Sequence, residues 1–245
     1  MTPDADSFRA LARSSPWRWR TLLLRARASW LGGEVVAYVD RPGRLVVRDA
    51  GGQVHRVQGL PYGSFSLRVG NGPGRPESRR TSLPHEVSPV LRPDGLVAER
   101  PLAHFEVDYD DPIWCNYTWV AMLDPVELSH HVRADRVRAD VVEGRDVWRA
   151  DLVPLPGYEP RCGGGCCELL WSEVSWHSDS DGPGTPNWRP VPEGTVFPDL
   201  HDVALDLQTG IVLRCLPVGA PDAVWQEMDV LEVDAPAPDW AQVAS

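Results

Sequence analysis

Short segments in which apolar and polar residues alternate recur along most of the chain, and most of them end near a glycine, proline or aspartate. Val137-Arg-Ala-Asp-Val141 is the clearest example. A period of two is typical of strands with one buried face, and the turn residues between the segments favour antiparallel neighbours. The chain is therefore predicted to be β-rich, with strands at 34–40, 44–49, 53–58, 64–69, 104–108, 114–123, 136–143, 146–153, 167–174, 203–207, 211–216 and 224–233.

Helices are predicted at few places. A serine–proline pair at 15–16 is typical of a helix start, so we expect a helix over 16–29, preceded by a shorter one over 6–13. Asp124 is expected to cap a short helix over 124–131. The sequence thus predicts an α+β fold dominated by antiparallel strands, with an N-terminal helix and one or two short helices.

The chain of 245 residues is short enough to form one domain, and we expect a single domain over 1–245. A Pro-, Gly- and Arg-rich stretch at about 70–101 interrupts the strand pattern and is expected to be a long loop or a partner-binding segment. The apolar run near Leu22 is short and broken by Arg25 and Arg27, which excludes a secretory signal or a membrane span there. A cytoplasmic location is expected.

Charge is distributed unevenly along the chain. Residues 1–100 contain 16 arginines against 9 acidic residues, a balance of +7, whereas residues 101–245 contain 8 against 26, a balance of −18. The acidic total argues against general binding of nucleic acid, which requires a basic surface. We expect the basic N-terminal part to pack against the acidic C-terminal part, with an acidic partner as the alternative.

Eleven tryptophans are many for this length. Tryptophan combines a large apolar ring with one N–H donor, so it is common at the edges of cores and in the walls of cavities. The tryptophans expected to lie on strands and to line a binding face are Trp114, Trp119, Trp148, Trp171 and Trp225.

Three cysteines lie close together around a glycine run, as Cys162, Cys166 and Cys167. Thiolates are preferred zinc ligands, and the glycines would let the backbone turn them toward one ion. The second Cys-x-x-Cys pair of the common zinc motifs is absent. A zinc site, a redox disulfide and buried structural cysteines all remain open.

Two other polar clusters suggest chemistry but are incomplete. The stretch at 177–182 resembles the front of a calcium loop, but it has His177 where the loop needs its first acid and Trp188 where it needs its last. His201 lies between Asp199 and Asp202, as a base would, but no nucleophile can be assigned to it. No residue is assigned a catalytic role, and the sequence favours a protein that is not an enzyme.

Three segments together resemble the lipoprotein-carrier superfamily of the LolA and LppX type. They are Arg41-Pro-Gly-Arg-Leu-Val-Val-Arg48, Val142-Glu-Gly-Arg-Asp-Val-Trp-Arg149 and Leu205-Asp-Leu-Gln-Thr-Gly-Ile-Val-Leu-Arg214. The resemblance implies a curved antiparallel sheet, an incomplete barrel, wrapped on helices around an apolar cavity. The export signal and lipid-attachment cysteine of that family are absent from the sequence.

The leading hypothesis is a non-enzymatic binding protein that holds an apolar small molecule or a partner segment on the concave face of its sheet. The alternative is a cytosolic interaction or regulatory module that docks an acidic partner through its basic N-terminal part. A zinc-stabilised module is the third hypothesis. The oligomeric state stays open.

Overall fold

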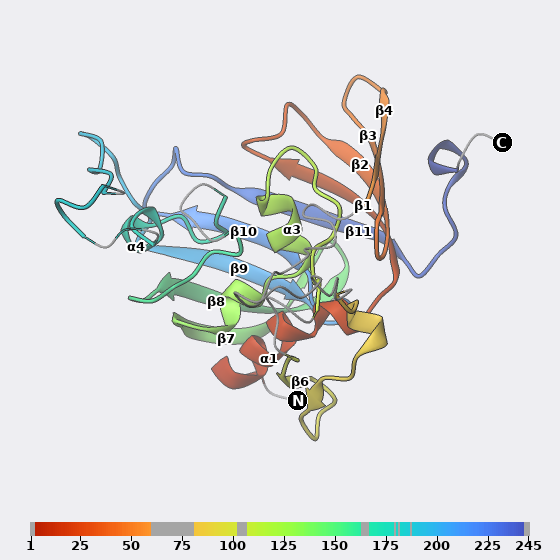
Figure 1. The fold of residues 1–245 in the computed structure, drawn as a ribbon, viewed down its shortest axis with the longest axis horizontal. Coiled ribbons are helices and arrows are strands. Elements are labelled where there is room, and N and C mark those ends of the chain that lie inside the picture. The colour runs from red at the N-terminus through yellow and green to blue at the C-terminus, as the bar shows by residue number, and fades with distance from the viewer. Residues whose placement is uncertain are drawn as a thin grey trace, which may run out of the picture.

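The computed structural model describes residues 3–242, except 60–80, 102–106, 163–166, 179, 181 and 187. Within these residues nine strands form one antiparallel sheet in the order β4-β3-β2-β1-β11-β10-β9-β8-β7 (Figure 1). The strands are β1 (Thr21–Ala28), β2 (Val35–Asp40), β3 (Arg44–Arg48), β4 (Val54–Gln58), β7 (Val132–Val142), β8 (Arg145–Pro154), β9 (Leu200–Asp206), β10 (Val212–Val218) and β11 (Gln226–Val233). Because β4 and β7 are edges, the sheet is not closed into a barrel.

The helices are few and short, as predicted for the fold class. The α-helices are α1 (Ala5–Ser14), α3 (Thr118–Leu123) and α4 (Glu173–Trp176), and the 3-10 turns are η1 (Ser15–Trp17), η2 (Pro84–Glu86), η3 (Val126–Ser129) and η4 (Asp239–Ala241). A separate two-stranded hairpin joins β5 (Val90–Leu91) to β6 (Val97–Glu99) within the segment predicted to be a long loop. None of the helices in the described part of the chain is long and apolar enough to span a bilayer.

The N-terminal helix lies earlier than its main prediction. Helix α1 matches the shorter helix predicted over 6–13, and the Asp4 carboxylate caps it by accepting a hydrogen bond from the Ser7 N–H at 2.7 Å. The helix predicted over 16–29 is wrong, because β1 occupies most of that range between β2 and β11. Arg25 and Arg27 are two residues apart, as on one face of a strand, whereas Arg18 and Arg25 are seven apart, as on one side of a helix. The spacing therefore fits both structures, and pairing on both sides selects the strand.

Three further predictions fail between β6 and β9. The strand predicted over 114–123 is largely helix α3, whose six residues are all buried, and the strand predicted over 167–174 ends in α4. A short apolar run that is buried on all sides has no periodicity that separates strand from helix. Asp124 does not cap η3, because its carboxylate binds arginines instead. The strands predicted over 64–69 and most of 104–108 lie outside the described residues.

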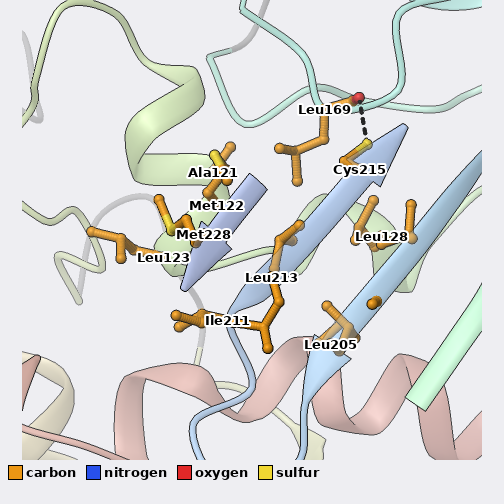
Figure 2. Close-up of a cluster of buried hydrophobic side chains, with 14 of the residues drawn as sticks. Ala121, Met122, Leu123, Leu128, Leu169, Leu205, Ile211, Leu213, Cys215 and Met228 are labelled. Atoms are coloured by element: carbon orange, nitrogen blue, oxygen red, sulfur yellow. Dashed lines mark hydrogen bonds between the residues drawn. The ribbon is translucent and has the colours of Figure 1, made fainter. Parts of the chain in front are cut away.

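The main core fills the space between one face of the sheet, here called the inner face, and helices α1 and α3 (Figure 1). Figure 2 shows its centre, where side chains of β9, β10 and β11 meet those of α3. The Cys215 thiol donates a hydrogen bond to the Leu169 carbonyl at 3.3 Å, which connects β10 to the loop around Leu169. The labelled side chains are Ala121, Met122, Leu123, Leu128, Leu169, Leu205, Ile211, Leu213, Cys215 and Met228.

Arginines of the N-terminal part pair with acids of the C-terminal part, as the charge distribution predicted. The Asp124 carboxylate is fully buried and accepts hydrogen bonds from Arg100, at 2.9 Å for its Nη1, and from Arg161. Arg41 makes a two-point contact with buried Asp111 at 2.8 and 2.7 Å. Burial alone would raise the pKa of Asp124, but its arginine partners outweigh that effect and lower it.

The sheet is nearly divided between β10 and β11. These strands share two register pairs, Arg214 with Glu227 and Cys215 with Gln226. By comparison, β11 shares seven pairs with β1. The strands therefore diverge beyond Glu227, and the sheet consists of a β7–β10 part and a β11–β4 part joined by a short seam.

Candidate functional site

The five tryptophans predicted to form a binding face lie in different environments. Trp119 on α3 and Trp148 on β8 are buried in the main core. Trp114, Trp171 and Trp225 are partly buried and lie outside the named strands, so Trp148 alone of the five lies on a strand.

Several of these rings pack on protein side chains. Trp114 lies against His55 with ring centroids 4.9 Å apart, and Trp171 lies against Phe197 at 4.8 Å. The inner face that carries Trp148 is covered by α1, α3 and the loop around Leu169. Over the described residues this face is therefore packed rather than open.

The cysteine cluster is described in part. Cys162 and Cys167 are partly buried, and the Cys167 carbonyl accepts a hydrogen bond from the Thr118 hydroxyl at 3.0 Å. Cys166 lies outside the described residues. Among those that are described, no three His, Cys, Asp or Glu side chains gather as a metal site would require.

The structure separates His201 from the carboxylate beside it in sequence. His201 is buried on the inner face of β9, whereas Asp202 faces the opposite side and pairs with Arg149 there. Neither ring nitrogen of His201 has a hydrogen-bond partner in the described structure, and burial lowers its pKa to about 4. A base assisted by Asp202 is thus excluded by the alternation of the strand.

The opposite face of the sheet, here called the outer face, carries a lattice of alternating charges. On β7 and β8, Arg138 lies 3.6 Å from both Asp151 and Asp202, and Arg149 bridges Asp140 and Asp202 at 2.9 and 2.6 Å. The lattice continues across the seam, where Arg214 pairs with Glu227, Arg27 with Glu227, and Arg25 with Asp229 and Glu34.

Within the lattice, arginines and carboxylates stabilise each other's charged forms. The hydrogen bond from Arg149 is the main cause that lowers the pKa of Asp140. The carboxylate of Asp202, followed by that of Asp140, raises the pKa of Arg149. Both groups therefore stay ionised over the whole physiological range, and neither is suited to donate or accept a proton in catalysis.

A pocket of about 200 Å³ opens on this face at the seam. Its walls carry three arginines and four carboxylates. The Arg214 Nε is buried there without a hydrogen-bond partner in the described structure. The lining residues are Arg25, Arg27, Glu34, Val142, Glu143, Leu213, Arg214, Glu227, Met228 and Asp229, and none of the five tryptophans is among them.

Sequence reasoning missed this site, although part of its signal was visible. Arg25 and Arg27 alternate with buried alanines, and β7 alternates arginine and aspartate. Each pattern indicates a charged strand face. That the two faces belong to one surface follows only from the strand order, which places β1 beside β11 and β11 beside β10.

Comparison with known proteins gives little that bears on function. No protein-family model and no curated protein matches the chain. The crystal structure of MucB is similar with a TM-score of 0.38 and 13% sequence identity, over 99% of this chain and 63% of that chain. The chain thus spans less than two thirds of MucB, and a similarity at this level does not establish a common family. The resemblance to lipoprotein carriers stays a prediction.

Proposed function

We propose that this protein is a non-enzymatic binding protein that recognises a mixed-charge segment of a partner protein on the outer face of its sheet. The observation that carries the proposal is the contrast between the two faces. The inner face is filled by its own core, whereas the outer face exposes an ordered arginine–carboxylate lattice around a pocket.

The chemistry of the pocket favours a charged ligand over an apolar one. Its volume of about 200 Å³ lies below the roughly 300–1,000 Å³ typical of small-molecule sites, and most of its lining side chains are charged. An acyl chain gains affinity by burying apolar area, and a charged wall offers little of it. A polypeptide that places a few side chains in the pocket and others along the lattice needs no large cavity.

The alternation of charge on the outer face indicates which charge pattern a partner segment should have. A purely acidic or purely basic segment would meet like charges at every second position, and like-charge contacts are costly. A segment that alternates both signs can form new pairs with Arg25, Arg27, Glu227 and Asp229, which are partly exposed. Exposed pairs contribute only about 0–1 kcal/mol each, so they can be exchanged for pairs with a partner.

Three fluorescein-labelled octapeptides test this proposal by fluorescence anisotropy: alternating Arg-Asp, all-Asp and all-Arg. We expect the alternating peptide to bind best, with an affinity that falls as salt is added. Arg27→Glu should weaken its binding at least tenfold. Arg20→Glu is the matched control, since Arg20 is an exposed arginine that does not line the pocket.

Two other results would redirect the assignment. Preferred binding of the all-Asp peptide would favour the acidic-partner hypothesis instead. A lipid-sized adduct in native mass spectrometry of the purified protein, with no binding of any peptide, would overturn the proposal and favour an apolar ligand.

A further inference from the structure

Strand β7 is the last strand at one end of the sheet, and in the described part of the chain no strand pairs with its outer edge (Figure 1). Helix α1 covers the start of this edge, where Arg9 donates a hydrogen bond to the Val132 carbonyl at 2.9 Å. A bulge at Arg136, which has φ of 48°, then interrupts the pairing with β8. The regular part of the open edge is therefore the run after the bulge, residues 137–141, here called the edge run.

The turn between β7 and β8 determines which backbone groups of the edge run point outward. Glu143 and Gly144 form a two-residue loop with φ of 49° and 76°, and Val142 pairs with Arg145 across it. The two residues that close such a loop exchange backbone hydrogen bonds, and every second residue before them does the same. The residues whose backbone groups face away from β8 are therefore Val137, Ala139 and Val141.

Two hydrogen bonds agree with this assignment. The Val141 N–H donates to the carboxylate of Asp140 at 2.8 Å and not to β8. On β8, the Asp146 carbonyl accepts from the Leu207 N–H at 3.0 Å, so the residue that follows Arg145 faces the β9 side. The edge run thus presents outward donors and acceptors in the alternation that an added antiparallel strand requires.

The edge run, Val137-Arg-Ala-Asp-Val141, is complementary to itself in the antiparallel direction. When Ala139 lies opposite Ala139 of a second copy, Val137 lies opposite Val141, and Arg138 lies opposite Asp140. Arg138 and Asp140 then occupy non-hydrogen-bonded positions, where facing side chains are closest. A shift of this pairing to the adjacent allowed registers would place Arg138 against Arg138 or Asp140 against Asp140.

The side chains of the edge run are accessible in the single molecule. Val141 is 60% exposed, and Ala139 is also exposed. The side chains of Arg138 and Asp140 are 39% and 36% exposed. The apolar side chains would be covered by a second edge run, and the charged ones can reach across to it.

We infer that the edge run is a dimerisation site, at which β7 pairs antiparallel with β7 of a second copy of this chain about a two-fold axis. A second copy is the occupant because the run's own charges pair fully in the register centred on Ala139. The bulge at Arg136 and the helix beyond it limit the pairing to this run. The contact uses the same edge of both molecules, so it closes as a dimer at β7. It lies away from the seam pocket, and the inference does not depend on the proposed function.

Two charge reversals test the inference by analytical ultracentrifugation of the full chain, in which wild type should sediment as a dimer. Arg138→Asp and Asp140→Arg each place like charges opposite one another on both sides of Ala139, so each variant alone should dimerise at least tenfold more weakly. An equimolar mixture of the two should form a heterodimer, because every facing charge pair is then of opposite sign. Arg133→Asp is the matched control, since Arg133 is an exposed arginine of β7 before the bulge, and it should dimerise like wild type.

A proline substitution gives a second test that leaves the charges unchanged. Proline has no N–H, and the Ala139 N–H faces away from β8, so Ala139→Pro should fold and remain a monomer. Ala134→Pro, on the same strand before the bulge, is its control and should dimerise. Urea unfolding followed by tryptophan fluorescence checks that each variant is folded. A monomeric wild type, a folded Ala139→Pro that stays dimeric, or a mixture of folded charge variants without heterodimer overturns the inference.

Discussion

Replacement of Asp124 by asparagine is expected to be among the most destabilising single changes in this protein. The carboxylate is fully buried and serves two arginines, Arg100 and Arg161, whose side chains are 9% and 8% exposed. Arg161 keeps a second carboxylate, Asp110 at 3.1 Å. Arg100 keeps a hydrogen bond to the Arg13 carbonyl at 2.8 Å and its contacts with the Tyr109 and Trp17 rings, but no other carboxylate among the described residues pairs with it, so the substitution leaves its charge buried without a counter-ion.

Removal of one partner of a buried ion pair typically costs about 3–5 kcal/mol of unfolding free energy. That is a large part of the roughly 5–15 kcal/mol that stabilises an ordinary protein. Urea unfolding followed by tryptophan fluorescence measures it, and with a slope of about 3 kcal/mol per molar the midpoint should fall by about 1–2 M.

Asp140→Asn is the matched control, because it also removes an aspartate bonded to an arginine, Arg149 at 2.9 Å, but on the exposed outer face. Because solvent screens this exposed pair, the urea midpoint of Asp140→Asn should shift much less than that of Asp124→Asn. If the two substitutions cost the same, or if Asp124→Asn costs less than about 1 kcal/mol, the argument that burial makes this network essential is refuted.

Three further predictions concern buried groups. Burial lowers the pKa of His201 to about 4 in the folded protein, whereas in the unfolded chain it is about 6.5. As pH falls from 6.5 to 4, His201 is therefore protonated in the unfolded chain and not in the folded protein, and the free energy of unfolding decreases by about 3 kcal/mol. Urea midpoints across this range should be flatter for His201→Leu, and not for the exposed control His85→Leu, although buried carboxylates with raised pKa values oppose the trend. Burial raises the pKa of the Cys215 thiol to about 12, so iodoacetamide at pH 8 should label exposed Cys115 in the native protein and reach Cys215 only after unfolding, as site-resolved mass spectrometry would show. Trp119→Ala should cost about 3–5 kcal/mol in the same urea assay, and a smaller cost would show that α3 collapses into the space.

β7 and the β9–β10 hairpin could be predicted from the sequence, β7 from its alternation and the hairpin from the turn residues between two apolar runs. The turn of that hairpin is fixed by Asp206, which accepts hydrogen bonds from the Thr209 N–H and hydroxyl at 2.7 and 2.6 Å. β1 also alternates buried and exposed residues, but its sequence fits a helical pattern as well, so it was predicted as a helix. Helix α3 could not be predicted, because all six of its residues are buried and it has no solvent-exposed side to give a helical pattern of polar residues.

The candidate site required information that a linear pattern does not hold. Arg25 and Asp229 are about two hundred positions apart, and they meet because β1 and β11 are paired near the middle of the sheet. The prediction that all five tryptophans lie on strands is wrong for a related reason, because in the described structure only Trp148 does so. It was based on residue type and on short apolar runs, which do not distinguish a strand from a buried helix or loop.

The short seam between β10 and β11 has a consequence for how the molecule moves. Adjacent strands of a sheet are normally held together by a continuous ladder of backbone hydrogen bonds. Here the two halves of the sheet share two register pairs. Amide hydrogens at this seam should exchange with solvent at lower free energies than those of β8 or β1, which pair on both sides over longer runs. We therefore expect the two halves of the sheet to open as separate cooperative units at this seam. The pocket is lined by residues from both sides of the seam, so a ligand bound there would stabilise the contact between the halves.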